Sequence, residues 1–354
     1  MINSLRLQNF RSYKDESLEF EKGVNIIVGP NASGKTNLLE AILVACTGDS
    51  YRAKDVELVR FGQKWARLDA QYDEEPRSIK IKLNPDKLVS SKTFEISSKP
   101  YKRPPFEKTI PVVLFEPEHL QLLNGQPELR REFLDSLLEK TLAGYSQLRR
   151  QYQRTLRQRN ALLKHGLATA NKQIFAWDIR LSELGGQIAV CRNQLAEKMD
   201  EETTNLYPKL SKTKVKLKMK YESALKINQY SSQLLHTLQR NLEKDCLRGY
   251  TSAGPHRDDL KITFDGHPAE DSASRGEVRT LLLALKVVEL KLIEDIRGQK
   301  PLLLLDDVFS ELDGTRRRAL TSFLKNYQTF ITTTDADVVV KHFIGNCNII
   351  PTTK

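Results

Sequence analysis

Residues 29–36 of this 354-residue chain read Gly-Pro-Asn-Ala-Ser-Gly-Lys-Thr, which matches the phosphate-binding pattern Gly-x-x-x-x-Gly-Lys-Ser/Thr. Residues 24–28, just before the loop, are apolar and rich in β-branched side chains, which predicts a buried strand. Residues 36–43, just after it, carry apolar side chains at helical spacing, which predicts a helix. A glycine-rich turn that arose by chance needs neither flank, so the three segments together favour a phosphate loop between a strand and a helix.

The residue types in this loop suit ATP with its Mg²⁺ ion. Gly29 and Gly34 let the backbone curve closely around phosphate oxygens, while the loop amides and the helix N-terminus offer positive partial charge. Lys35 is predicted to neutralise the β- and γ-phosphates, and the Thr36 hydroxyl to bind Mg²⁺. The predicted ATP contacts in this stretch are Gly29, Pro30, Asn31, Ala32, Ser33, Gly34, Lys35, Thr36 and Asn37.

A second segment supplies the carboxylates that this chemistry needs. Residues 301–307 read Pro-Leu-Leu-Leu-Leu-Asp-Asp, a hydrophobic strand that ends in two acids. We expect Asp306 to hold Mg²⁺, directly or through water, and Asp307 to orient or deprotonate the attacking water. The alternative is a buried strand that an aspartate merely caps. Lys35, Asp306 and Asp307 in one chain favour a catalytic set.

Residues 272–277, Ser-Ala-Ser-Arg-Gly-Glu, precede a helix predicted over 278–295. Ser274, Gly276 and the helix N-terminus are compatible with a second anion-binding site. An ordinary N-cap by Ser272 or Ser274 explains the same pattern, and the residue types alone leave both interpretations open.

The composition favours a cytoplasmic protein with a polyanionic partner. The formal net charge is +11, which suits nucleic acid, although many basic surfaces are only solvated. The four cysteines form no Cys-x-x-Cys pair, so neither a zinc site nor a disulfide framework is indicated. The N-terminus resembles a strand rather than a signal peptide, and no apolar run has the length of a membrane span.

The order of patterns along the chain predicts an α/β head with an inserted helical arm. In residues 2–10, Ile2 is expected to face the opposite side from Leu5 and Leu7, and residues 56–100 alternate as in an antiparallel meander. From about residue 128, glycine and proline become rare, and two antiparallel helices of roughly thirty residues each are expected, with a turn within 165–171. The second helix carries a heptad seam at Trp177, Leu181, Leu184, Ile188, Cys191 and Leu195. The predicted domains are residues 1–125 with 245–354 for the head and residues 126–244 for the arm.

Two basic runs lie on or beside this arm. The first, on a helix, is Arg149, Arg150, Arg154, Arg157 and Arg159. The second, on a predicted strand with one lysine-lined face, is Lys212, Lys214, Lys216, Lys218 and Lys220. Each run is either a contact surface for phosphates or a solvated face, and the sequence leaves both open. The DNA-binding candidates are Arg149, Arg150, Arg154, Lys212, Lys214 and Lys216.

These motifs together resemble the ABC-type ATPases, in the branch that contains the structural-maintenance-of-chromosomes proteins and the double-strand-break repair ATPases. Within this branch the chain resembles the bacterial RecF family nearly end to end. The segment most typical of that family is Gly254–Leu260, which reads Gly-Pro-His-Arg-Asp-Asp-Leu. The other matching segments are residues 7–13, 29–41, 113–120, 125–127, 130–135 and 303–313.

The resemblance implies a fold and a mechanism. The fold is an ABC-type head, with a mixed sheet and an antiparallel meander, plus an inserted antiparallel helical arm. ATP is expected to drive a head-to-head homodimer, with each nucleotide between Lys35 of one protomer and a signature loop of the other. That loop comprises Ser274, Arg275, Gly276 and Glu277. Arg11 is expected to reach the nucleotide, although the residues alone also fit a surface loop. Ser310 and Asp313 are expected to couple the two sites at the junction.

The same resemblance implies partners and a role. The dimer is expected to clamp DNA near gaps and, with RecO and RecR, to promote loading of RecA on single-stranded DNA. Hydrolysis is expected to be slow and DNA-stimulated, and the protein to associate with the nucleoid rather than a membrane. Three residues depart from the usual ABC pattern: Glu277 stands where glutamine is common, Asp307 where glutamate is usual, and Asp335 where a switch histidine is expected.

Three other classes share part of the pattern. The nucleotide-binding subunit of a membrane transporter needs the phosphate loop and Asp306, but the heptad arm and the basic charge oppose it. A chromosome-organising ATPase needs a much longer coiled coil, and the related break-repair ATPases carry a Cys-x-x-Cys hook that this chain lacks. A small-molecule kinase has no use for the paired segments at 274–277 and 310–313.

Overall fold

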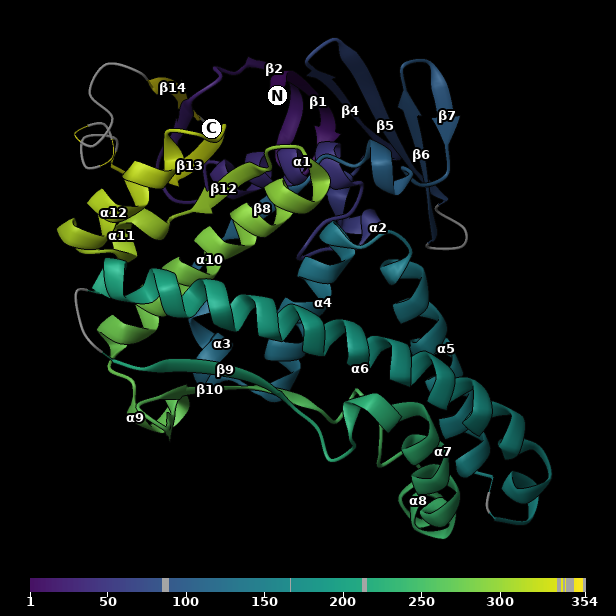
Figure 1. Ribbon diagram of the computed structural model, residues 1–354. Helices are drawn as coiled ribbons and strands as arrows, with labels where there is room; N and C mark the ends of the chain where they lie inside the picture. The colour runs from purple at the N-terminus through teal and green to yellow at the C-terminus, as the bar shows by residue number, and fades with distance from the viewer. Residues whose placement is uncertain are drawn as a thin grey trace. The chain divides into compact units, whose positions relative to one another are not determined.

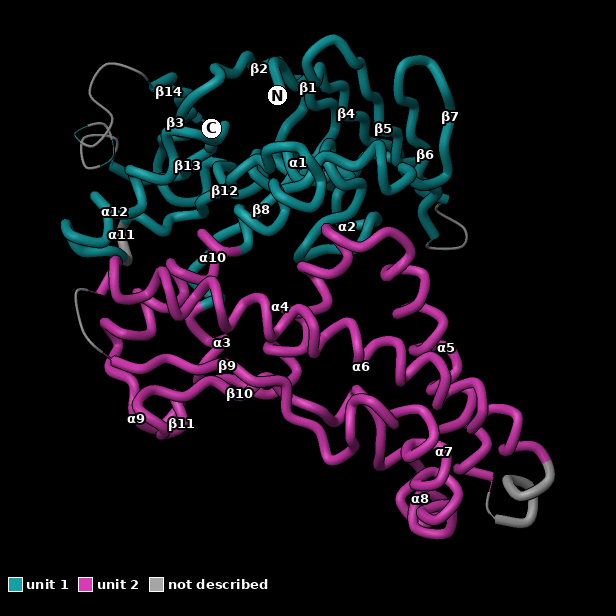
Figure 2. Tube along the Cα trace, viewed as in Figure 1, with its two compact units in different colours: residues 1–119, 289–354 teal, residues 120–288 magenta. Residues whose placement is uncertain are grey.

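The computed structural model describes residues 1–84, 89–165, 167–211, 215–335, 339, 341 and 347–352, with only the backbone described for 167–172, 310 and 311. It divides into two compact units, Met1–His119 with Glu289–Lys354 and Leu120–Val288 (Figure 2). We refer to them as unit 1 and unit 2. The domain boundaries expected from the sequence, at residues 125/126 and 244/245, stay a prediction.

Unit 1 contains a parallel sheet with the strand order β14-β3-β13-β12-β8. The strands β3, β8, β12 and β13 are almost wholly buried, and β8 and the leucines of β12 form continuous apolar runs, as expected of a parallel sheet covered on both faces. The buried strands expected before the phosphate loop and before Asp306 are β3 and β12. The bounds are β3 (Val24–Val28), β8 (Val112–Phe115), β12 (Leu302–Asp306), β13 (Thr329–Thr333) and β14 (Cys347–Pro351).

Four helices are connected to the strands of this sheet. The helix α1 (Lys35–Thr47) follows β3 directly after the phosphate loop, as its leucine spacing predicts, and ends at Gly48, whose φ of 94° suits glycine. The others are α10 (Arg275–Arg297), whose last residues belong to unit 1, α11 (Val308–Glu311) and α12 (Gly314–Leu324).

A second sheet in unit 1 is antiparallel, with the order β2-β1-β4-β5-β6-β7 (Figure 1). It includes the meander that the alternation over residues 56–100 predicts. The strands are β1 (Ile2–Phe10), β2 (Tyr13–Glu19), β4 (Trp65–Tyr72), β5 (Glu75–Asn84), β6 (Val89–Ile96) and β7 (Lys99–Tyr101). Two short helices, α2 (Asp55–Leu58) and η1 (Phe106–Lys108), precede β4 and follow β7, while η2 (Pro117–Leu120) follows β8.

The expected orientation of Ile2 is wrong. Ile2 is buried together with Leu5 and Leu7, although simple alternation puts it on the opposite face of the strand. The pairing of β1 with β4 shifts register between Ile2 and Ser4, so an irregularity returns Ile2 to the core side.

Unit 2 is built around one long helix, α6 (Leu167–Ser211), which packs against α5, α7 and β9 (Figure 1). A three-stranded antiparallel sheet, β11-β10-β9, completes the unit. The other helices are α3 (Gln121–Asn124), α4 (Pro127–Thr141), α5 (Tyr145–Leu163), η3 (Ile227–Gln229), α7 (Tyr230–Arg240), α8 (Leu242–Arg248) and α9 (Ala269–Ser272). The strands are β9 (Leu217–Glu222), β10 (Asp259–Phe264) and β11 (His267–Pro268).

The helices of the expected arm exist, but their lengths differ from the prediction. The helix α5 has 19 residues and α6 has 45, rather than roughly thirty each. Gly144, with a φ of 85°, marks the start of α5, whereas α6 continues because its buried face extends to Met199, Tyr207 and Leu210. The helix α5 ends at Leu163 and α6 begins at Leu167, so the turn begins near the N-terminal end of the predicted range.

Arg159 is not part of a basic surface. Its side chain is fully buried, and its guanidinium pairs with Asp178 at 2.6 Å and with Asp245 at 2.8 Å. Breaking such a buried pair from one side leaves an uncompensated charge and typically costs about 3–5 kcal/mol. Arg159 therefore belongs to an internal ion-pair cluster, although in sequence it looks like the other arginines of α5.

Residues 254–260, the segment most typical of the resembled family, form hydrogen bonds to several elements in the interior of unit 2. The buried carboxylate of Asp258 accepts hydrogen bonds from the hydroxyls of Tyr221, at 2.7 Å, and Tyr230, at 2.6 Å. His256 Nδ1 lies 2.6 Å from the Tyr152 hydroxyl on α5. These bonds connect α5, α7 and β9 through one short segment, so its role within unit 2 is structural.

His256 is expected to make unit 2 sensitive to acid. Burial lowers the pKa of His256 to about 4, with Arg257 opposing the imidazolium, whereas an unfolded histidine titrates near its ordinary value of about 6.5. The unfolded state therefore binds the proton first, and stability falls as the pH drops from about 6.5 towards about 4. Unfolding in urea at pH 7.5 and pH 5 should show His256→Gln losing about 2 kcal/mol less than the parent over this interval. An equal loss in both proteins contradicts this assignment.

Candidate nucleotide-binding site

The predicted phosphate-loop and carboxylate residues meet at a cavity of about 340 Å³ in unit 1. The cavity lies where the loop between β3 and α1 meets the carboxyl ends of β12 and β13, the edge at which parallel α/β sheets bind ligands. Its lining residues are Asn31, Ala32, Gly34, Lys35, Thr36, Asn37, Asp306, Asp307 and Thr332.

The backbone of the loop is fixed by contacts that leave no room for larger residues. Gly34 has a φ of 101°, and a Cβ there would lie 2.9 Å from Ser12 Oγ. A Cβ on Gly29 would lie 2.3 Å from Thr352 Oγ1. Ser33 bonds the same Thr352 hydroxyl at 2.7 Å, so Gly29 and Ser33 shape the loop without lining the cavity.

Lys35 lies at the centre of the loop with its ammonium held by backbone. Its Nζ donates to the carbonyls of Gly29 at 2.8 Å and Pro30 at 2.9 Å, and the side chain is nearly buried. Phosphate oxygens are charged acceptors and bind an ammonium more strongly than neutral carbonyls do. The position therefore fits a group that neutralises phosphate charge.

Thr36 and Asp306 form an oxygen pair of the kind that Mg²⁺ prefers. Thr36 Oγ1 donates to Asp306 Oδ1 at 3.2 Å across the cavity. Thr332, on the neighbouring strand, donates to the same oxygen at 2.6 Å and accepts a bond from the Asp307 amide at 2.9 Å. Hydroxyl and carboxylate ligands, completed by phosphate and water, suit an octahedral Mg²⁺ site. The residues present thus fit the ion.

Thr332 was not among the residues expected from the sequence. Its strand reads Thr-Phe-Ile-Thr-Thr over 329–333, and β13 pairs with both β3 and β12, with Thr332 directly opposite Asp306. A threonine near the carboxyl end of a strand beside the carboxylate strand is the signal that identifies it.

Asp307 projects from a strained position at the end of β12. Its φ is 52°, in the left-handed region that aspartate and asparagine tolerate better than most residues. The residue lines the cavity and is exposed. This geometry fits a carboxylate that contacts a water beside the γ-phosphate.

Arg11 does not line the cavity, because a buried glutamate on α1 holds it. Arg11 Nε and Nη2 pair with the two oxygens of Glu40 at 2.8 and 3.0 Å. Glu40 is fully buried and also accepts bonds from Ser50 Oγ at 2.6 Å and Arg52 at 3.0 Å. Burial raises the pKa of Glu40, but these donors outweigh it and hold the pKa below its usual value. Contact between Arg11 and nucleotide stays a prediction.

Ser274 and Glu277 form a reciprocal cap at the N-terminus of α10. The Glu277 carboxylate accepts from Ser274 N at 2.8 Å and from Ser274 Oγ at 2.7 Å, and Ser274 Oγ accepts from Glu277 N at 3.3 Å. This is a capping box, for which glutamate and glutamine are equivalent choices. It accounts for Glu277 locally, while the action of Ser274, Arg275 and Gly276 on another protomer's nucleotide stays a prediction.

Asp313 has a local role as the N-cap of α12. Its Oδ1 accepts from Arg316 N at 2.9 Å, which lowers the pKa of the Asp313 carboxyl, and the Arg316 guanidinium pairs with it as well. The side chain of Ser310 lies outside the described residues. Coupling of two sites by Ser310 and Asp313 stays a prediction. Asp335, at the expected switch position, is exposed, and its amide bonds Thr333 Oγ1 at 3.1 Å.

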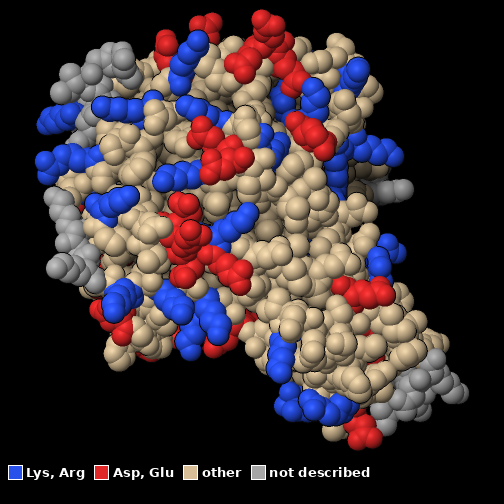
Figure 3. Space-filling view, viewed as in Figure 1, with Lys and Arg blue, Asp and Glu red and all other residues tan. Residues whose placement is uncertain are grey.

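The basic residues proposed to contact DNA differ in whether their side chains are exposed or already paired with acidic residues. Arg149 pairs with Glu132, Asp135 and Glu139, so it is less suited to a phosphate than Arg150 or Arg154, whose side chains are exposed on α5. Lys212 and Lys214 lie outside the described residues. Lys216 precedes β9, on which Lys218 and Lys220 form an exposed face, and basic side chains gather over β9 in Figure 3. DNA contact by any of them stays a prediction.

The fold and the cavity define the class: an ABC-type ATPase. Residues 4–250 match the model of a family described as an AAA domain. A RecF of Halothermothrix orenii is 36% identical over 94% of this chain and 92% of its own length, and a RecF of Streptococcus pyogenes is 36% identical over 95% and 92%. The chain belongs to the RecF family.

Solved structures agree with this assignment. The structure of a recombination mediator RecF with an ATP analogue has a TM-score of 0.86 at 31% identity and covers 99% of this chain and 96% of its own. A structure of RecF with ATP has a TM-score of 0.83 at 32% identity, covering 94% and 92%. An Smc head bound to the C-terminal winged-helix domain of ScpA matches the fold alone, with a TM-score of 0.54 at 18% identity, covering 96% and 91%. No helix among the described residues is long and apolar enough to cross a membrane.

Proposed function

We propose that this chain is an ATP-dependent DNA clamp of recombinational gap repair. The observation that carries the proposal is the convergence of Lys35, Thr36, Asp306 and Asp307 on one cavity, in a chain of the RecF family. The relatives of known structure were solved with ATP or an analogue and are described as mediators in the RecFOR pathway, which supports the same ligand and pathway here.

We assign a separate role in ATP hydrolysis to each group of residues that lines the cavity. Lys35 and the loop amides bind the phosphates, and Thr36 with Asp306 holds Mg²⁺, which neutralises the charge that develops on the transferred phosphoryl group. Asp307 orients the attacking water and takes up its proton. Aspartate is one carbon shorter than the glutamate usual at this position, which is consistent with slow turnover.

We further propose that two protomers complete the site. In this arrangement the N-terminus of α10, with the Ser274 hydroxyl and the helix amides, binds the γ-phosphate of the partner protomer's nucleotide, and Glu277 keeps the loop in place through the cap. The dimer holds DNA at gaps, acts with RecO and RecR to promote RecA loading on single-stranded DNA, and is reset by DNA-stimulated hydrolysis. It works in the cytoplasm at the nucleoid. Family membership favours this function over the nucleotide-binding subunit of a transporter and over a chromosome-organising ATPase.

Ser274→Arg tests the two-protomer site. The larger charged side chain at the helix N-terminus is expected to weaken ATP-dependent dimerisation at least about tenfold, or about 1.4 kcal/mol, while ATP binding by the monomer is unchanged. The measurement is sedimentation velocity with ATP over a range of protein concentrations, with ATP affinity measured separately.

One variant serves as the control. Ser272→Arg places the same charge two residues earlier, on the exposed end of α9. A dimer of normal strength in Ser274→Arg contradicts the two-protomer site. Equal weakening in Ser272→Arg would show that added charge near this helix end, and not the contact at Ser274, is responsible.

A further inference from the structure

The turn before β4 presents an aromatic ring wholly to solvent. Phe61 is 101% exposed, although a phenylalanine gains about 1.5–3 kcal/mol from full burial. The turn is closed by a bond from Gln63 N to Arg60 O at 2.9 Å and is anchored by one from Arg60 N to Asn9 O at 2.8 Å. An exposed ring on an anchored turn is a feature that folding alone does not require.

A second aromatic ring follows four residues later, on the open face of the antiparallel sheet. Trp65 is 42% exposed and lies directly opposite Lys82 on β5. The bond from Leu83 N to Lys64 O, at 2.8 Å, ties the turn to the end of β5. The two rings thus belong to one region, where the sheet face meets the turn.

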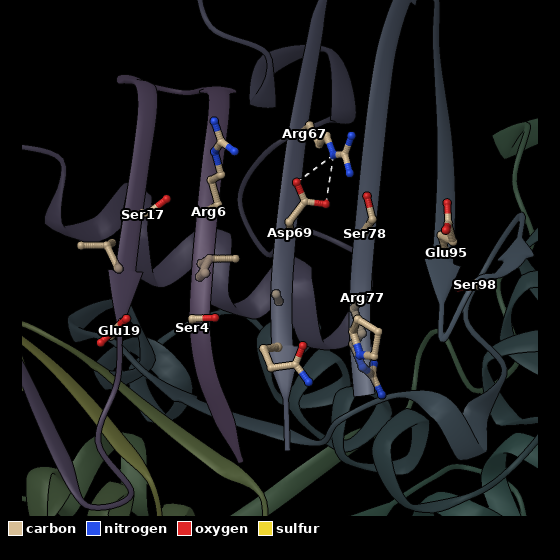
Figure 4. A pocket seen from close by; sticks show the side chains of 15 residues that line it. Ser4, Arg6, Ser17, Glu19, Arg67, Asp69, Arg77, Ser78, Glu95 and Ser98 are labelled. Carbon is tan, nitrogen blue, oxygen red and sulfur yellow. Dashed lines mark hydrogen bonds and ion pairs between the residues drawn. The ribbon is translucent and has the colours of Figure 1, made fainter. Parts of the chain in front are cut away.

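Among the described residues, the charged side chains at this turn and at the facing end of β5 are all cationic. Lys64 and Lys82 are exposed, Arg60 and Lys80 are partly buried, and none of these four forms an ion pair within the described part of the chain. Farther along the same face the charge becomes mixed. Figure 4 shows Arg67 paired with Asp69 on β4, beside Arg6 and Ser78, where these residues line a cavity of about 640 Å³. The cationic region therefore ends at Arg67.

We propose that this region, the turn patch of Arg60, Phe61, Lys64, Trp65, Lys80 and Lys82, binds single-stranded DNA. The choice of DNA rests on the proposed function. Cations track the phosphates, and aromatic rings stack on unpaired bases at about 1–3 kcal/mol per base without regard to sequence. Paired bases in a duplex do not present their faces to Phe61 or Trp65, so the patch discriminates for single strands. None of these six residues lines the nucleotide cavity.

The test uses the full-length protein without nucleotide and a fluorescent oligo(dT) of about twenty nucleotides, with anisotropy measured at several salt concentrations. Phe61→Ala/Trp65→Ala is expected to weaken binding at least about tenfold, because two stacking partners are lost. Phe61→Tyr/Trp65→Tyr keeps the rings and should retain affinity. Phe175→Ala, which removes a ring that is 55% exposed on α6, is the matched control.

The contributions of charge and of stacking are measured separately, by the salt dependence of binding and by tryptophan fluorescence. Lys64→Gln/Lys82→Gln should reduce the slope of log affinity against log salt by about 1.4, since each phosphate contact on a single strand contributes about 0.7. Lys99→Gln, an exposed lysine on β7, should not change it. In Trp177→Phe, Trp65 is the remaining tryptophan of the two, and its emission should be quenched by the oligonucleotide.

The outcomes distinguish this inference from the proposed function. Unchanged oligonucleotide binding in Phe61→Ala/Trp65→Ala, with normal ATP-dependent binding of duplex DNA, overturns the turn patch and leaves the clamp intact. Patch-dependent oligonucleotide binding in a protein that never binds duplex with ATP supports the turn patch and contradicts the clamp. Equal loss of both activities in the alanine variant also overturns the inference, because stacking on unpaired bases cannot explain it.

Discussion

Lys35→Ala is expected to weaken ATP binding at least about a hundred-fold, or about 2.7 kcal/mol. Among the described residues, Lys35 is the one side-chain cation that lines the cavity, and hydrogen bonds to charged groups contribute about 1.5–3 kcal/mol each. The backbone amides of the loop remain, so residual weak binding of phosphate is expected rather than none. Isothermal calorimetry with a non-hydrolysable ATP analogue measures the change.

Lys22→Ala is the matched control for Lys35→Ala. Lys22 is an exposed lysine just before β3, so the variant loses the same charge without touching the cavity. Circular dichroism should show both variants folded, because the carbonyls of Gly29 and Pro30 that Lys35 bonds lie at the surface loop and can accept water. Parent-like ATP affinity in Lys35→Ala would remove this residue from the site.

Asp307→Asn is expected to lower the turnover number about a hundred- to ten-thousand-fold while ATP remains bound. The substitution removes the group that positions the water and accepts its proton, a role that typically contributes such a factor. Asparagine tolerates the left-handed backbone at φ 52°, so the loop geometry is preserved. Single-turnover hydrolysis, followed by release of labelled phosphate, measures the effect, and dimers should persist in ATP.

The control for Asp307→Asn is Asp265→Asn, which removes one carboxylate from another left-handed position, φ 49°, in unit 2. Its hydrolysis should match the parent. Unchanged hydrolysis in Asp307→Asn would show that a different group orients the water. A loss of ATP binding in the same variant would place Asp307 in nucleotide binding instead.

The nucleotide cavity was predictable because its chemistry is local in sequence. The loop at 29–36 and the acids at 306–307 each follow a buried strand, and parallel strands bring their carboxyl ends to one edge. Thr332 and Glu40 were missed because neither is one of the residues that define the phosphate-loop pattern or the acidic end of the strand. Thr332 reaches the site because its strand pairs with the strand of Asp306, whose carboxylate it hydrogen-bonds. Glu40, which pairs with Arg11, lies in a helix whose other residues predict a buried hydrophobic face.

The predictions that were wrong concern partners distant in sequence. The arginines of α5 look alike, yet Arg159 pairs with Asp178 and Asp245, which are 19 and 86 residues away and which no local pattern indicates. Likewise, the side on which Ile2 lies depends on its register with β4, and not on its own strand. Helix lengths in unit 2 depend on packing between helices, which periodicity in a single segment does not determine.

The most direct test of the clamp is sedimentation of the purified protein with labelled gapped duplex DNA at fixed salt, with ATP and with ADP. Lys35→Ala serves as the control that should not respond to ATP. The account predicts a DNA-bound dimer with ATP that becomes weakly bound monomer with ADP. A monomer that ignores both nucleotide and DNA would contradict it.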